Sequence, residues 1–264
     1  MTSTSISQIS AKLNYPRSLS IVIPAFNEEQ YIAETIKNIT HVAKGSLDDF
    51  EIIVVDDGST DATVEIVRAL VDKIDQLRLV IHPVNQGVGS VFHTGLKESS
   101  CEYITIVPGD GAYDEESLIE AFSSVGAAKH IGTTRKRRVN YSLGPRTFFS
   151  WIFQLLIGFF LQIGVTDPHS VQIYCSNSLK SLHLHQKGYM YALEALAKLR
   201  LQQKDVIEFS VQLKSLAMAR TNALRFGVFI SIINLLWSLQ NIGRIKAFIF
   251  TVITFTSIIF CNVG

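Results

Sequence analysis

Two adjacent carboxylates, Asp56 and Asp57, stand at the end of an apolar run at residues 52–55. The run is β-branched throughout and has no polar alternation, which is typical of a strand at the centre of a parallel sheet. Gly58 then turns the chain, and residues 59–61 have side chains that cap helices. In open α/β sheets ligands bind beyond the carboxyl ends of the strands, so these acids lie where a ligand is expected. A turn followed by a helix cap is the alternative interpretation, and it stays open here.

Segments that alternate between strand and helix patterns surround these acids. Apolar runs at residues 18–24, 77–82 and 103–107 resemble the run at 52–55, and each is followed by a polar turn. Apolar residues at helical spacing follow the first turn, where Asn27 is placed to cap the helix. Four such units within about a hundred residues predict an α/β protein with a doubly wound, mostly parallel sheet and right-handed crossovers.

The third of these turns carries Gln86, Gly87 and Gly89 at the start of a helix. Glycines let the backbone approach a ligand closely, and the N–H groups at a helix start bind anions, so a ligand is expected here as well. No Gly-x-Gly-x-x-Gly pattern opens any of the predicted helices, which disfavours a dinucleotide-binding enzyme.

Composition limits the classes of function. The 264 residues are 47% hydrophobic and 18% charged, which is more apolar than most soluble domains. A net charge of +1 disfavours nucleic acid as a partner, and the basic run at 135–138 is typical of solvated surface. Cys101, Cys175 and Cys261 have neither metal-ligand spacing nor the pattern of a disulfide framework. The Ser/Thr-rich residues 1–17 predict a flexible tail without a secretory signal.

Four motifs follow one another along residues 18–116: Ile23-Pro24-Ala25-Phe26-Asn27-Glu28, Val55-Asp56-Asp57-Gly58-Ser59-Thr60-Asp61, Asn85-Gln86-Gly87, and an aspartate after the fourth strand. Their order resembles that of the inverting family-2 glycosyltransferases of GT-A fold, which have a Rossmann-like sheet. The resemblance implies a nucleotide-sugar donor bound at the first three motifs. The donor-binding residues that it implies are Pro24, Ala25, Asn27, Glu28, Asp56, Asp57, Gln86 and Gly87.

Asp110 matches the second Asp of that family's Asp-x-Asp metal motif, and the first Asp would fall at Pro108. The resemblance implies Mg²⁺ or Mn²⁺ as a cofactor, held by Asp110 with Asp114 and the oxygens of the donor diphosphate. It also makes Asp110 the acid expected to matter most for catalysis, because charge on the leaving nucleotide must be neutralised.

Further along the chain stand Arg135, then Arg146 with Ser150 one helical turn later, then Asp167. These residues resemble the branch of the family that makes polyprenyl- or dolichyl-phosphate sugars. The resemblance implies that they bind the acceptor, with the arginines and the serine on a lipid phosphate whose geometry suits a guanidinium fork. Residues 171–173 replace the Gly-Phe-Arg that this branch usually has there.

The segment Tyr189-Met-Tyr-Ala-Leu-Glu194 is similar to a helix that contributes an acid near the acceptor in these enzymes. Two interpretations of Glu194 stay open. Either it serves catalysis together with Asp110, Arg135 and Arg146, or it is an exposed helical glutamate.

Long apolar stretches predict contact with a membrane. Residues 148–165 carry polar or small side chains at every fourth position, which predicts an interfacial helix at about 145–165, with an ordinary buried helix as the alternative. Residues 226–243 and 247–264 carry no charge and predict helices that lie in or span a membrane.

We therefore expect a tail over residues 1–17, a GT-A domain over 18–225 and membrane-associated helices over 226–264. The expected activity is transfer of a hexose from a UDP- or GDP-linked sugar to a polyprenyl or dolichyl phosphate, by a membrane-associated protein whose catalytic domain is cytoplasmic. A glycan or glycolipid hydroxyl as acceptor and a catalytically silent, scaffolding relative are the alternatives. A homo-oligomer is compatible with each of them.

Overall fold

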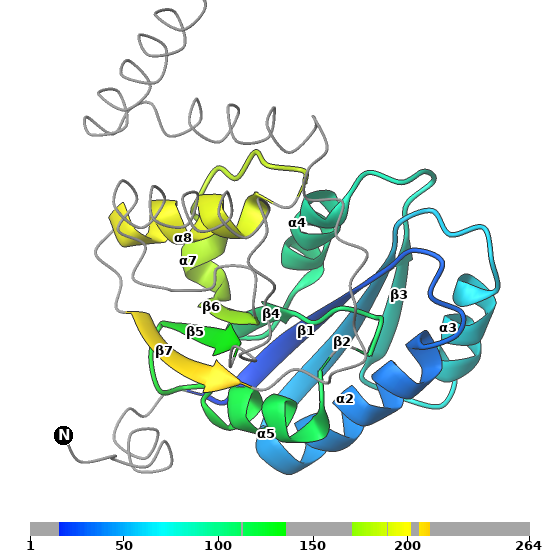
Figure 1. Ribbon diagram of the computed structural model, residues 1–264, viewed down its shortest axis with the longest axis horizontal. Coiled ribbons are helices and arrows are strands. Elements are labelled where there is room, and N and C mark those ends of the chain that lie inside the picture. The colour runs from blue at the N-terminus through cyan, green and yellow to red at the C-terminus, as the bar shows by residue number, and fades with distance from the viewer. Residues whose placement is uncertain (1–15, 112, 136–170, 189, 202–205, 212–264) are drawn as a thin grey trace, which may run out of the picture.

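A single mixed sheet is the centre of the structure, a computed structural model that describes residues 16–111, 113–135, 171–188, 190–201 and 206–211. Within these residues the strands are β1 (Ser18–Ala25), β2 (Asp49–Asp56), β3 (Leu77–Ile81), β4 (Tyr103–Ile106), β5 (His130–Arg135), β6 (Gln172–Cys175) and β7 (Val206–Val211). They lie side by side in the order β3-β2-β1-β4-β6-β5-β7 (Figure 1).

The first four strands form the parallel half of the sheet. β1 pairs in parallel with β2 on one side and with β4 on the other, and β2 pairs in parallel with β3. The strand order therefore reverses between β1 and β4, and ligands of doubly wound sheets bind at such a switch point. β6 is antiparallel to both β4 and β5, so the predicted mostly parallel sheet is confirmed with one reversed strand.

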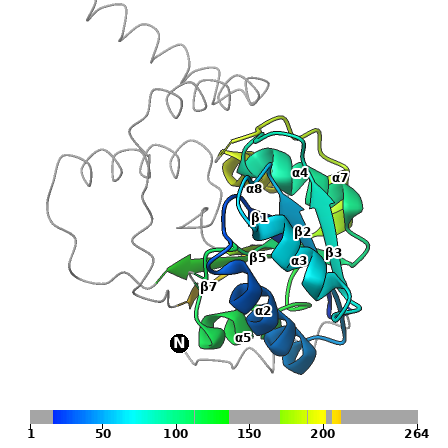
Figure 2. The same cartoon turned by 90° about the vertical axis from the view of Figure 1, so that its right-hand side faces the viewer.

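Helices cover both faces of this sheet. They are α2 (Ile32–Ser46), α3 (Thr63–Val71), α4 (Val88–Glu98), α5 (Glu115–Ser123), α7 (Ser176–Lys180) and α8 (Tyr191–Leu201). Residues of α2, α3 and α5 pack into one hydrophobic core, and residues of α4, α7 and α8 pack into a second. The two cores lie on opposite faces, as the positions of α2 and α8 in Figure 1 and Figure 2 show.

Strand residues alternate between these two cores, which explains the continuous apolar runs. On β1, Ile21 and Ile23 belong to the first core and Val22 to the second, and all three are fully buried. Burial of each such side chain contributes about 1.5–3 kcal/mol. Gly95 lets α4 approach β1, because a Cβ there would lie 2.4 Å from a methyl group of Val22.

The regions expected to contact a membrane, at about 145–165 and over 226–264, lie outside the described residues. Within the described ranges no helix is long and apolar enough to span a bilayer.

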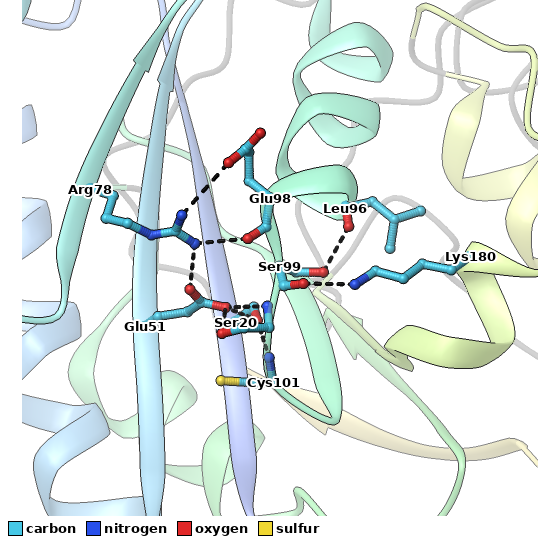
Figure 3. Close-up of polar contacts among 9 residues, drawn as sticks. Ser20, Glu51, Arg78, Leu96, Glu98, Ser99, Cys101 and Lys180 are labelled. Atoms are coloured by element: carbon cyan, nitrogen blue, oxygen red, sulfur yellow. Dashed lines mark hydrogen bonds and ion pairs between the residues drawn. The ribbon is translucent and has the colours of Figure 1, made fainter.

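A polar network closes the amino edge of the sheet, opposite the ends that carry the motifs (Figure 3). Glu51 on β2 accepts hydrogen bonds from Ser20 Oγ (2.6 Å), from the backbone N–H of Ser100 (2.6 Å) and from Arg78 Nη2 (2.5 Å). Burial alone would raise the pKa of Glu51, but hydrogen bonds from Ser20, Ser100 and Arg78 lower it below its usual value. The network ties the turn before β4 to β1, β2 and β3.

Glu51→Gln should lower the free energy of unfolding at pH 7 by about 1 kcal/mol, because it removes the charge from these hydrogen bonds at a partly exposed edge. The folded-state pKa is lowered, so this stabilisation is present above the usual pKa of a glutamate and is lost as pH falls through the folded value. Urea unfolding at several pH values would measure it. Glu98→Gln is the control, because Glu98 meets Arg78 only at 3.6 Å on the surface and should change stability little. An equal loss in both variants would contradict the assignment.

Candidate active site

The carboxyl ends of β1, β2 and β4 meet at one edge of the sheet, and the predicted residues of the first half of the chain lie there. Asp56 is the last residue of β2. The loop after β4 lies against β1, because a Cβ on Gly109 would be 2.9 Å from the carbonyl oxygen of Pro24. Thr35 Oγ1 on α2 donates to the carbonyl of Gly109 at 3.0 Å. These contacts place Asp110 beside the switch point.

The carboxylate of Asp57 is surrounded by donors from the β3–α4 loop. Its Oδ1 accepts from the backbone N–H of Gln86 at 3.0 Å, and its Oδ2 accepts from that of Gly87 at 2.8 Å. His82 Nδ1 lies 2.8 Å from Oδ1, and its Nε2 lies 2.9 Å from Thr94 Oγ1. Asp57 is only 4% exposed, so its carboxylate oxygens are largely shielded from water and depend on these donors. Asp57 therefore sets the conformation of the third motif.

Asp56 has one bonded and one unbonded oxygen. Its Oδ2 accepts from the backbone N–H groups of Gly58 (3.1 Å) and Ser59 (3.0 Å), which closes the turn after β2. Its Oδ1 is buried and has no hydrogen-bond partner within the described structure. A buried acceptor without a donor costs about 1–3 kcal/mol, and a donor on a ligand would recover it. The turn and the ligand-binding interpretations of this acid are thus compatible.

The first two motifs bind each other in both directions. The hydrogen bonds run from Asn27 N to Ser59 Oγ (2.9 Å), Thr60 N to Asn27 Oδ1 (2.9 Å), Glu28 N to Thr63 Oγ1 (2.9 Å), Glu29 N to Asp61 Oδ2 (3.2 Å) and Ala62 N to Glu29 Oε2 (3.0 Å). The prediction that Asn27 caps the helix following it was wrong. Tyr31 is the N-cap of α2, and the amide of Asn27 instead accepts from the N–H ahead of α3. Asn27 has a φ of 56°, which asparagine tolerates better than most residues.

Glu28 and Asp110 are brought together at this edge. Burial raises the pKa of Glu28, and the nearby charges of Asp110 and Asp61 raise it further. Mutual repulsion of this kind is relieved when a cation binds. Two carboxylates with several phosphate oxygens suit Mg²⁺, which is usually held in that way. Glu28 and Asp110 therefore have the ligand type that a divalent cation takes together with a diphosphate.

Asp114 has a structural role as a helix cap. It is the N-cap of α5, and its Oδ1 accepts from the backbone N–H of Ser117 at 2.9 Å. Among the described residues no group of three or more His, Cys, Asp or Glu side chains could hold a metal ion. The structure thus joins Asp110 to Glu28 and gives Asp114 a capping role, and metal binding by Asp114 stays a prediction.

Gly87 and Gly89, at the start of α4, pack against the backbone of residues 186–187. A Cβ on Gly87, which has a φ of 90°, would lie 3.0 Å from the carbonyl oxygen of Lys187. A Cβ on Gly89 would lie 2.4 Å from the carbonyl oxygen of Gln186. The 186–187 backbone therefore occupies the place of a side chain at Gly89, and the approach of a ligand to this helix start stays a prediction.

The predicted acceptor residues are described in part. Arg135 is the last residue of β5, where it pairs with Val211 of β7, and its side chain is not described. Arg146, Ser150 and Asp167 lie outside the described residues. Their roles stay predictions.

Glu194 lies in the first turn of α8 and is fully buried, so the exposed alternative was wrong. Its Oε2 accepts from the backbone N–H groups of His185 and Gln186, each at 2.8 Å. Its Oε1 lies 2.7 Å from Lys198 Nζ. The carboxylate is engaged by protein donors on both oxygens.

Two side chains of the site were missed by sequence reasoning. His82 orients Asp57, and Thr94 orients His82. His82 directly follows β3, and its place at the carboxyl end of a strand was the available signal. Thr94 has no such signal, because it lies within α4.

A family model described as glycosyl transferase family 2 matches residues 20–179. Among curated proteins, an uncharacterised glycosyltransferase of Haemophilus influenzae is 34% identical over 100 residues, covering 38% of this chain and 39% of that protein. A dolichyl-phosphate beta-glucosyltransferase of Trichomonas vaginalis is 28% identical over 211 residues, covering 73% of this chain and 63% of that protein. The chain thus spans less than two thirds of the length of these relatives.

Among solved structures, glucosyl-3-phosphoglycerate synthase of Mycobacterium tuberculosis in complex with UDP matches with a TM-score of 0.66 at 18% identity. The match covers 93% of this chain and 86% of that one. Other structures of that enzyme contain Mn²⁺ with UDP and phosphoglyceric acid, or Mg²⁺ with UDP. The likeness confirms the predicted GT-A fold.

Asp57→Asn should lower the free energy of unfolding by about 2–3 kcal/mol, because an amide has one acceptor oxygen and leaves a buried N–H of the loop unpaired. Asp56→Asn is the matched control. Its amide oxygen can keep the bonds to Gly58 and Ser59, and its NH₂ group replaces an oxygen that already lacks a partner, so the loss should be smaller than in Asp57→Asn. Denaturant unfolding of both variants measures the difference, and equal losses would show that Asp57 does not organise the loop.

Glu28→Gln should raise the melting temperature at pH 7 in the absence of divalent cations. The pKa of Glu28 is raised in the folded state, so its ionisation destabilises the fold at pH values above the usual glutamate pKa. The gain should disappear at pH values where the wild-type carboxyl is protonated. Glu29→Gln is the control. Its amide oxygen can still accept from the Ala62 N–H, and the variant should not be more stable than the wild type. A lower melting temperature for Glu28→Gln would contradict the repulsion.

Proposed function

The chain belongs to glycosyl transferase family 2, and from this premise we propose that it transfers a hexose, with inversion, from a UDP- or GDP-linked sugar to a polyprenyl or dolichyl phosphate. The reaction would take place at the cytoplasmic face of a membrane. The observation that carries the choice of acceptor is the complete engagement of Glu194 by protein donors.

The donor would bind at the carboxyl edge of the sheet, at the switch point between β1 and β4. The buried Oδ1 of Asp56 lacks a hydrogen-bond partner within the described residues, and it would accept from an N–H or O–H of the nucleotide if donor binding opened the turn after β2. Glu28 and Asp110 would hold Mg²⁺ or Mn²⁺ with the diphosphate. Such an ion would neutralise the charge that the leaving nucleotide acquires. Structures of the structural neighbour with UDP and Mn²⁺ support the use of a divalent metal ion in general.

The acceptor follows from what the site must supply. A sugar hydroxyl is a poor nucleophile until a base removes its proton, whereas a phosphate monoester is anionic at neutral pH. Glu194, the acid predicted near the acceptor, is fully buried and cannot receive a proton from a substrate in this conformation. A phosphate acceptor needs charge compensation instead, which Arg135 and Arg146 would provide. The likeness to a dolichyl-phosphate beta-glucosyltransferase over 73% of the chain supports the same choice.

A hydroxyl acceptor is the second candidate. A poly(ribitol-phosphate) beta-N-acetylglucosaminyltransferase of Staphylococcus aureus is 31% identical over 104 residues, although these cover only 18% of that protein. An acceptor of this class would require a base other than Glu194.

The metal assignment predicts a contrast between two aspartates. Asp110→Asn should reduce turnover by about 10²-fold or more, because it removes a cation ligand at the leaving group. Asp114→Asn should have little effect, because asparagine caps helices as well as aspartate does. Transfer from labelled UDP-glucose and GDP-mannose to polyprenyl phosphate, with and without EDTA, measures both. Equal losses in the two variants would indicate that Asp114 is also a metal ligand. Transfer that continues in EDTA would show that the reaction needs no metal ion.

The acceptor assignment predicts that Arg146→Lys damages transfer to polyprenyl phosphate at saturating donor, because a point charge replaces a planar fork. Glu194→Gln should affect the rate constant far less, because no proton passes through it. A collapse for Glu194→Gln with little change for Arg146→Lys would instead favour a hydroxyl acceptor.

A further inference from the structure

The carboxylate of Glu194 fixes the backbone segment that precedes α8. The N–H groups of His185 and Gln186 both donate to its Oε2. Lys198 Nζ donates to its Oε1 and also to the carbonyl of His183. A fully buried carboxylate with three donors is a strong constraint, because each lost bond would leave a polar group buried without a partner.

This segment in turn holds the first turn of α4. The carbonyl of Lys187 accepts from the backbone N–H of Ser90 at 3.2 Å, one of the groups that a helix start leaves without an intrahelical partner. The carbonyl of Gln186 lies 3.2 Å from His93 Nε2. Gly89 has no room for a Cβ against the same carbonyl. The two backbones are therefore in direct contact, and neither can move without the other.

The start of α4 is also the part of the chain that Asp57 binds. The N–H groups of Gln86 and Gly87 donate to Asp57, and Ser90 Oγ donates back to the carbonyl of Gln86 at 3.0 Å. Thus Ser90 contacts the segment before α8 through its backbone and the third motif through its side chain. A displacement of the segment would reach the third motif through this residue.

We infer that Glu194 is a positioning residue for the donor loop, defined as residues 85–87, and that it acts through residues 185–187 and the first turn of α4. The inference rests on the proposed function, in which the donor loop binds the nucleotide sugar. Glu194 acts on donor binding without touching donor or acceptor. Loss of a positioning residue of this kind should raise the donor KM, whereas loss of a general base should lower kcat.

The substitutions at Glu194 should be graded. Glu194→Ala removes the acceptor of two N–H groups, whereas Glu194→Gln keeps one oxygen that can accept from both. Gly89→Ala disturbs the same contact from the α4 side and leaves Glu194 intact. Gly95→Ala is the control for general destabilisation, because it crowds Val22 on another face of the same helix. Gly45→Ala is a neutral control, because a Cβ there would have nothing within 4 Å.

Hydrogen–deuterium exchange of the full-length protein tests the coupling without any ligand. In Glu194→Ala and Gly89→Ala, amide exchange in a peptide spanning residues 82–90 should increase by about 10-fold, as bonds to Asp57 open more often. Glu194→Gln should give a smaller increase. Gly95→Ala, compared at an equal loss of melting temperature, should show no selective increase there. Unchanged exchange at residues 82–90 in Glu194→Ala would overturn the inference. If Glu194→Ala does not fold, unchanged exchange in both Glu194→Gln and Gly89→Ala would overturn it.

Calorimetric titration with UDP and with GDP, each with MnCl₂, tests the consequence for the donor. Glu194→Ala and Gly89→Ala should weaken binding of the preferred nucleotide by about 10-fold, and the double variant should be weakened no further, because both act on one contact. In transfer assays the donor KM should rise while kcat at saturating donor is kept. Wild-type affinity in both single variants would overturn the inference, as would a loss confined to kcat and absent from Gly89→Ala.

The two proposals fail separately. If the wild-type protein binds neither UDP nor GDP, the proposed function and the donor role of the loop both fail, and the exchange measurement still decides whether Glu194 controls residues 85–87. If the wild-type protein binds a nucleotide and the variants match it, only the inference fails.

Discussion

The carboxyl edge of the sheet, where the motifs lie, depends on the hydrogen bonds that the buried carboxylate of Asp57 accepts. A carboxylate at this position is stable only because the N–H groups of Gln86 and Gly87 and the ring of His82 converge on it. These donors belong to the loop after β3, so the end of β2 and the start of α4 are ordered together. The first two motifs are ordered in the same way, by hydrogen bonds between residues 27–29 and 59–63. Many polar residues of these motifs thus serve to fold the site.

Acids at the edge consequently have divided roles. Asp57 and Asp114 accept hydrogen bonds from backbone N–H groups, and Asp56 accepts such bonds on one of its oxygens. At Glu28, by contrast, burial and the nearby charges of Asp110 and Asp61 raise the pKa. Sites that do chemistry commonly contain such a strain in their electrostatics. The hydrogen bonds of Asp57 and Asp114 show how these two acids shape the site, and the charge of Asp110 near Glu28 marks a second place at this edge where acids gather.

Local pattern was sufficient to predict the parallel half of the fold. The runs at β1 and β2 are apolar on both faces because two separate cores cover them, and that requirement is visible in the residues themselves. The antiparallel β6 was not predicted, because its pairing of Tyr103 with Cys175 joins distant parts of the chain. Residue types at the site were also predicted, but partners were not. Asn27 was assigned to the wrong helix because the N–H that it binds belongs to Thr60, in the turn after β2. The contact of Gly89 with residues 186–187 was not predicted, because these residues lie far along the chain.

A crystal structure of the full-length protein with UDP and Mn²⁺ would test this division of roles most directly. The account predicts an anomalous Mn²⁺ peak bound by Asp110 and Glu28 together with the diphosphate, with Asp57 still bonded to Gln86 and Gly87 and Asp114 still capping α5. Manganese on Asp114 in place of Glu28, or an Asp57 that has left the loop to bind the nucleotide, would contradict it.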